Sequence, residues 1–71
     1  MKQEILIKFG NKLRQERLKQ NLSQEAFAHK AGVHRTYIGM VERAEKNVTL
    51  LTIEKIAKTL GTSISELMKL D

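Results

Sequence analysis

Residues 23–43 read SQEAFAHKAGVHRTYIGMVER, and this stretch governs the interpretation of the whole chain. Its spacing predicts two short amphipathic helices, with Ser23 as the N-cap of the first. Gly32 lies between them and can supply the positive φ that a tight turn between helices requires. In the second helix, expected from about Arg35 to Arg43, Ile38 and Val41 point inward. Two helices held at a fixed angle by a short turn are therefore the organising feature of the sequence.

The chain on both sides of this stretch also has helical spacing. Apolar residues at intervals of three or four predict a helix over residues 4–20, after which Asn21 takes the left-handed conformation common at helix ends. The strongest apolar stripe predicts a helix over residues 50–60, with Thr49 as its N-cap and Gly61 just past its end. Strand-like alternation is hard to find, so the predicted fold class is all-α.

The last residues predict a fifth helix. Ser63 and Glu66 have the spacing of a capping box, in which each side chain satisfies an amide at the start of the helix. The apolar residues of this helix are Ile64, Leu67, Met68 and Leu70. We expect one compact five-helix domain that spans residues 1–71.

The composition narrows the possible functions. With 71 residues and no cysteine, the chain has no disulfide, no thiolate nucleophile and no sulfur-ligated zinc, and a large cofactor cleft is not expected. His29 and His34 lack the acidic or thiol partners of a metal site, and no catalytic constellation is visible, so we predict neither metal, cofactor nor enzymatic activity. No apolar run is long enough for a signal peptide or a membrane span, which predicts a protein of the cytoplasm.

The positive charge is concentrated in one part of the sequence. The net charge is +5, and residues 1–46 hold ten Lys and Arg against five Asp and Glu, whereas residues 47–71 hold three of each. The excess positive charge therefore lies in the part of the sequence that contains the two central helices. A basic face beside a neutral remainder is typical of a protein that binds nucleic acid.

These residues resemble a known family. LSQEAFAHKAGVHRTYIGMVER and LTIEKIAKTLGTSISEL are similar to the phage-repressor-like (Cro and repressor, XRE-type) helix-turn-helix domains, over about residues 9–70. Ala28, Gly32, Ile38 and Val41 fall where the motif has small, glycine and apolar residues. Within the family, HRTYIGMVERAEKNVTL looks most like the controller proteins of restriction–modification systems. His34 and Ala44 depart from the commoner small N-cap and glycine.

The resemblance implies which residues contact double-stranded DNA. The start of the second helix of the motif enters the major groove, which assigns base contacts to Arg35, Thr36 and, one turn later, Met40. Arg can pair with guanine O6 and N7 through two hydrogen bonds. Backbone contacts are assigned to Gln24, Tyr37, Arg43, Lys46 and Asn47.

Several of these assignments have plainer alternatives. On an isolated helix, Arg35 would as readily be a solvated surface charge as a base contact. Arg43 has the alternative role of complementing the dipole at the C-terminal end of its helix. Tyr37 can either touch the sugar-phosphate backbone or cover the core. Met40 can fill space in the core or reach the groove. These alternatives stay open at the level of sequence.

Arg17 and Glu42 are charged residues in positions that helical spacing assigns to inward faces. The family often has a partly buried Arg–Glu pair at these places. We therefore expect a structural ion pair, whose disruption should damage folding before it damages recognition.

The apolar end of the chain predicts self-association. Helices this short should not bury every apolar residue internally, so a homodimer interface is expected from about residues 50–71, the alternative being a plain monomer core. The assigned interface residues are Ile53, Ile64, Leu67, Met68 and Leu70.

The function predicted from sequence is that of a homodimeric regulator that binds a roughly palindromic DNA operator. The resemblance favours the controller of a restriction–modification system, with RNA polymerase as a further candidate partner. Phage-type or antitoxin-type repressors are the alternative within the family. A protein-interaction module that has lost DNA binding is the alternative from another class.

Overall fold

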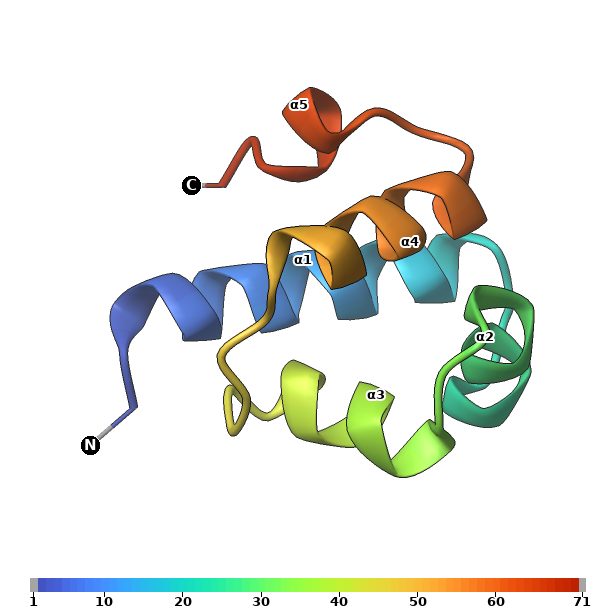
Figure 1. Cartoon of the computed structure of the whole chain (residues 1–71), viewed down its shortest axis with the longest axis horizontal. Helices are drawn as coiled ribbons and strands as arrows, with labels where there is room; N and C mark the ends of the chain where they lie inside the picture. Colours follow the sequence, from blue (N-terminus) through green and yellow to red (C-terminus); the bar gives the residue numbers. More distant parts are fainter. Residues whose placement is uncertain (1, 71) are drawn as a thin grey trace.

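The computed structural model describes residues 2–70, and within this range the chain forms helices and no strands (Figure 1). The helices are α1 (Glu4–Lys19), α2 (Gln24–Ala31), α3 (Arg35–Glu42), α4 (Leu50–Leu60) and α5 (Ile64–Leu67). The predicted all-α fold class with five helices is confirmed, with most boundaries within one residue of those expected.

Side chains that cap helix starts set several of these boundaries. The hydroxyl oxygens of Ser23, Thr49 and Ser63 each accept a hydrogen bond from a backbone N–H in the first turn of the helix that follows. Gly32 and Gly61 end α2 and α4 with φ values of 72° and 74°, the left-handed conformation that glycine adopts without steric cost. The local chemistry of the sequence therefore explains where these helices begin and end.

Two residues other than glycine also have positive φ. Asn21 follows α1 with φ 57°, as predicted, and Ala44 follows α3 with φ 62°. The alanine side chain is disfavoured in this conformation, which costs about 1–2 kcal/mol. Its methyl group is buried, so core packing offsets part of that cost.

The fifth helix is shorter than predicted. It ends at Leu67 after one turn, and Met68 and Leu70 follow outside it. Both side chains nevertheless pack against the core, so the apolar spacing reflected burial and not a longer helix. Only half of the capping box forms, because the Glu66 carboxylate accepts from Lys69 Nζ at 2.9 Å instead of returning to Ser63.

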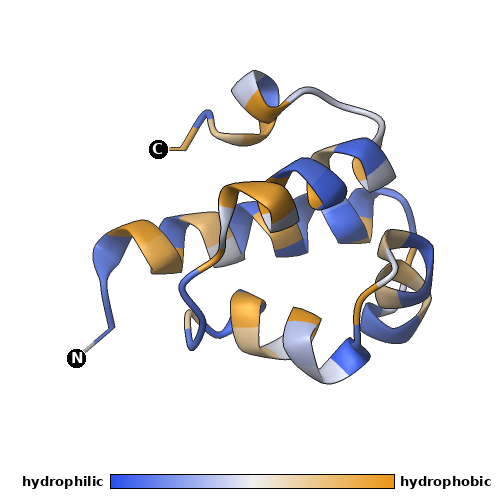
Figure 2. Cartoon of the chain, viewed as in Figure 1, coloured by the Kyte–Doolittle hydropathy of each residue, from blue (hydrophilic) through white to orange (hydrophobic). Residues whose placement is uncertain are grey.

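One core holds the helices together. Its largest fully buried side chains are contributed by all five helices: Leu13, Phe27, Ile38, Val41, Ile56 and Leu67. α2 packs on α3, α1 on α3, α2 on α4 and α4 on α5. In Figure 2 the apolar segments of α3 lie on the side of this helix that faces α1 and α4. The core thereby fixes α2 and α3 relative to the rest of the chain.

Gly10 sets the distance between α1 and α3. A Cβ atom on Gly10 would lie 2.6 Å from the carbonyl oxygen of Val41 and 2.8 Å from that of Glu42. Only glycine therefore allows the middle of α1 to come this close to the end of α3. Nothing in the local sequence around Gly10 indicates this role.

Candidate nucleic-acid interface

The turn between α2 and α3 is built as the sequence predicted. Gly32 turns the chain, Val33 packs half-buried against the core, and His34 caps α3. His34 is an uncommon N-cap, but its Nδ1 accepts a hydrogen bond from the backbone N–H of Thr36 at 3.1 Å. The imidazole thus caps the start of α3, as a serine hydroxyl caps the starts of α2 and α5.

A groove runs between the start of α2 and the outer side of α3. The residues that line it are Arg17, Ser23, Gln24, Glu25, Arg35, Thr36, Gly39 and Arg43. Four of these had been assigned to DNA contact, and the structure brings them together on one surface: Gln24, Arg35, Thr36 and Arg43. Arg35, Thr36 and Arg43 are exposed, whereas Gln24 is half-buried.

The other assigned residues lie around this groove or away from it. Tyr37 and Met40 are half-buried, and Tyr37 packs partly against the core. Lys46 is exposed in the loop after α3. Asn47 is exposed in the same loop but lines a separate small hollow against the start of α1.

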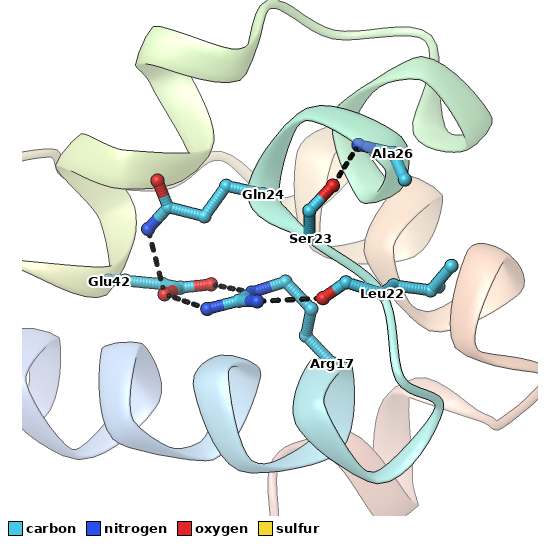
Figure 3. Close-up of polar contacts among 6 residues, drawn as sticks. All are labelled: Arg17, Leu22, Ser23, Gln24, Ala26 and Glu42. Carbon is cyan, nitrogen blue, oxygen red and sulfur yellow. Dashed lines mark hydrogen bonds and ion pairs between the residues drawn. The ribbon is translucent and has the colours of Figure 1, made fainter.

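The expected Arg17–Glu42 ion pair is present beneath the groove (Figure 3). Arg17 Nε and Nη2 donate to the two carboxylate oxygens of Glu42 at 2.7 and 3.0 Å, and Nη1 donates to the carbonyl oxygen of Leu22 at 2.7 Å. Only 8% of the Arg17 side chain and 4% of the Glu42 side chain are exposed. The hydrogen bonds to Glu42 raise the pKa of Arg17 above its ordinary value, against the opposing effect of burial. Arg17 therefore stays charged.

Gln24 joins this buried pair to the groove. Its Nε2 donates to Glu42 Oε1 at 3.1 Å, so three donors in all meet the Glu42 carboxylate (Figure 3). Within residues 2–70 no buried side-chain nitrogen or oxygen lacks a hydrogen-bond partner. The network holds Gln24 at the start of α2, where backbone N–H groups and the helix dipole favour an anion.

Both exposed arginines of the groove are paired with glutamates. Arg35 Nη1 lies 2.5 Å from Glu25 Oε2, and Arg43 Nη2 lies 3.2 Å from Glu45 Oε1. The hydrogen bond from Arg43 lowers the pKa of the Glu45 carboxyl. Solvent surrounds these pairs, so each contributes little to folding. Neither pairing was predicted from the sequence.

Lys2 is a further cation that the sequence analysis missed. Its Nζ donates to the backbone carbonyl oxygen of Arg43, at the C-terminal end of α3. A lysine near a chain terminus carries no periodic signal that would place it there. With Arg43 and Lys46 it adds positive charge where α3 ends.

Two residues assigned to the dimer interface are instead part of the core. Ile53 is 8% exposed and Leu67 is 1% exposed, so neither side chain is free to contact a second subunit. The remaining three are accessible to different degrees, Ile64 being exposed and Met68 and Leu70 half-buried. Both side chains belong to the buried core, so their burial gives no support to the prediction that they form the interface.

The most exposed apolar side chains of this end were not assigned. Leu50 and Leu51, in the first turn of α4, are 76% and 74% exposed. In Figure 2 this turn is the orange start of α4. Helical spacing had placed Leu50 on the apolar stripe of this helix, but both leucines lie off the side that α4 turns to the core, which is formed by Ile53, Ile56, Ala57 and Leu60.

No helix of residues 2–70 has the length and apolar character needed to cross a membrane. Within the same range, His, Asp and Glu side chains do not gather in groups of three that could hold a metal ion.

Comparisons with known proteins agree with this geometry. A family model described as helix-turn-helix matches residues 13–67. The chain is 48% identical over 69 residues to the control protein C.BamHI of Bacillus amyloliquefaciens, covering 96% of this chain and 85% of the relative. It is 46% identical over 65 residues to the control protein C.MunI of a Mycoplasma species, covering 90% and 88%.

Among solved structures, the restriction–modification controller protein C.AhdI from Aeromonas hydrophila superposes with a TM-score of 0.84. The sequence identity is 45%, and the match covers 87% of this chain and 94% of that one. The residues that line the groove all lie within the matched range, residues 13–67. The chain belongs to the XRE-type helix-turn-helix family of DNA-binding transcription regulators.

Proposed function

We propose that this protein is a sequence-specific regulator that binds a roughly palindromic DNA operator as a homodimer. The proposal rests on the groove in which Arg35 and Thr36 lie beside Gln24 and Arg43. Residues that can read bases and residues that can hold phosphates share this surface. Specific DNA binding requires that combination, because phosphate contacts set the register and base contacts set the sequence.

The roles within the groove follow from the chemistry of the side chains. Arg35 can donate two hydrogen bonds to guanine, and the Thr36 methyl or hydroxyl can meet a neighbouring base edge. Gln24 and the N–H groups at the start of α2 can hold one phosphate. Arg43, Lys46 and the newly placed Lys2 can hold phosphates where α3 ends.

The half-buried residues keep more limited roles in this proposal. Met40 can touch a base only with the part of its side chain that is exposed. Tyr37 can offer its hydroxyl to a phosphate while its ring packs on the core. Asn47 contacts the DNA backbone only if the duplex extends past the groove toward the start of α1.

Two copies of the chain are needed to span an operator. The longest dimension of the Cα trace is 29 Å, whereas successive major grooves on one side of B-DNA are about 34 Å apart. We propose that the copies meet through the α4–α5 end, with Leu50, Leu51 and Ile64 supplying exposed apolar surface in place of Ile53 and Leu67. The described chain then acts as one DNA-binding domain per subunit.

The identity of the regulated genes comes from the relatives. C.BamHI, C.MunI and C.AhdI are control proteins, and the matches span most of both chains in each comparison. We therefore propose that this protein controls a restriction–modification operon in the cytoplasm, with RNA polymerase as its partner at an activated promoter. An adjacent endonuclease gene and methyltransferase gene would support this role, whereas a toxin gene or a phage gene cluster would favour the alternative repressors.

A gel-shift titration at two salt concentrations tests the DNA-binding proposal. If Lys2, Arg43 and Lys46 contact phosphates in both subunits, six contacts displace counterions. The affinity should then fall about 10³-fold between about 50 and 200 mM salt. A protein-interaction module without DNA binding would show no shifted complex at either concentration.

A further inference from the structure

The ion pair between Glu25 and Arg35 joins the two helices of the motif across its DNA-facing side. Glu25 lies in the first turn of α2 and Arg35 in the first turn of α3. The Nη1–Oε2 distance is 2.5 Å, while 66% of the arginine and 69% of the glutamate side chain are exposed. A pair this exposed stabilises the fold little, so its position in the groove calls for another explanation.

The atoms used in this pair leave one edge of the guanidinium available. Arg17 shows what that edge can do, since its Nε and Nη2 donate side by side to the two oxygens of Glu42 (Figure 3). Arg35 is held through Nη1, and within residues 2–70 no hydrogen bond uses its Nε or Nη2. The same two-donor edge of Arg35 is therefore free to meet the O6 and N7 atoms of guanine.

We propose that Glu25 is the positioning residue for Arg35 and thereby sets the sequence preference of the protein. The inference rests on the proposed function, because it assigns Arg35 to base reading. Glu25 restrains a long, flexible side chain before DNA arrives, so that less side-chain freedom is lost on binding. It does so from α2, which is itself placed on the DNA backbone by Gln24.

The charge of Glu25 adds a second effect on discrimination. The carboxylate lies beside the anion-binding start of α2 and therefore repels DNA of any sequence. At a matching site, guanine and Glu25 share the donors of Arg35, and the repulsion is offset. At other sites the repulsion between Glu25 and the DNA is not offset, so the carboxylate lowers the affinity for non-specific DNA more than that for a matching site.

Glu45 offers a matched control. It also pairs with an exposed arginine of the groove, Arg43, but that arginine is assigned to phosphate. Removal of the Glu45 carboxylate takes away the same charge without releasing a base-reading side chain. It should raise the affinity for every DNA sequence by a similar factor.

The test compares a duplex selected from a randomised pool by the wild-type protein with a scrambled duplex of the same length and composition. We expect Glu25→Ala to lower the ratio of the two affinities about three- to ten-fold, the size of effect that loss of order in one arginine side chain produces. Its affinity for the scrambled duplex should rise. Glu45→Ala should leave the ratio unchanged, and circular dichroism should show that both variants are folded.

A double variant separates positioning from direct reading. In an Arg35→Ala background, Glu25→Ala should have no further effect on the ratio, because Glu25 acts through Arg35. A wild-type ratio in Glu25→Ala, or a further loss in the double variant, would overturn the proposal. If the wild-type protein itself shows no preference for the selected duplex, the proposed function fails, and this inference fails with it.

Discussion

Gly10→Ala is the substitution that most directly perturbs the placement of α3. The added Cβ would lie 2.6 and 2.8 Å from two backbone carbonyl oxygens of α3, well inside ordinary contact distance. Backbone cannot rotate away as a side chain can, so α1 and α3 must separate. Overpacking of this kind costs about 3 kcal/mol at the upper end of its usual range. Alanine recovers about 1 kcal/mol of helix propensity, which leaves a net loss of about 2 kcal/mol.

The assay is thermal unfolding followed by circular dichroism. A net loss of about 2 kcal/mol should lower the melting temperature by about 8–16 °C in a chain of this size. Gly39→Ala is the matched control, because a Cβ there would meet the flexible ends of Arg43 and Gln24 at 3.0 and 3.4 Å. It should melt at or above the wild-type temperature yet bind DNA more weakly. A Gly10→Ala protein that melts within about 2 °C of the wild type would show that α1 and α3 do not need glycine at their contact.

Three further predictions concern folding, assembly and pH. Glu42→Ala should lower the free energy of unfolding by about 3–5 kcal/mol, because it leaves the buried Arg17 without its partner. Glu54→Ala, which removes one partner of an exposed pair, is the control, and equal melting temperatures for the two variants would contradict this prediction. Leu51→Lys should convert dimer to monomer in sedimentation velocity, whereas Leu18→Lys on α1 should not; an unchanged sedimentation coefficient would exclude α4 from the interface. The hydrogen bond from Lys69 lowers the pKa of Glu66 below the ordinary glutamate value of 4.5. The stability that this pair contributes is therefore fully present above pH 4.5 and is lost as the pH falls below that value. The melting temperature should therefore decrease less on acidification in Glu66→Gln than in the wild type, and equal decreases would contradict the linkage.

Features set by neighbouring residues were predictable from the sequence. Ser23, Thr49 and Gly32 act within one turn of their own positions, so their residue types were enough to locate the helix ends. The Arg17–Glu42 pair was also foreseen, because helical spacing placed both charges on inward faces and the family resemblance implied that they pair. Local chemistry and helical spacing together gave the fold class.

Features that depend on distant contacts were not predictable in the same way. Gly10 looks like a weak position in a helix until α3 is placed against it. Glu25 looks like a favourable first-turn carboxylate until α3 brings Arg35 beside it. Helical spacing indicates that Leu67 lies on a covered face, but it does not distinguish burial within the chain from burial against a partner.

Arg35 reads a base in the proposed complex, and this role can be measured with a single substitution. Wild-type protein and Arg35→Ala are titrated against the selected operator duplex and its scrambled counterpart at the same salt concentration. Arg35 is exposed, so the variant should fold and keep much of its non-specific affinity. Operator preference should fall at least tenfold, since each arginine–guanine contact is worth about 1–3 kcal/mol. An Arg35→Ala protein that prefers the operator as strongly as the wild type would contradict this role.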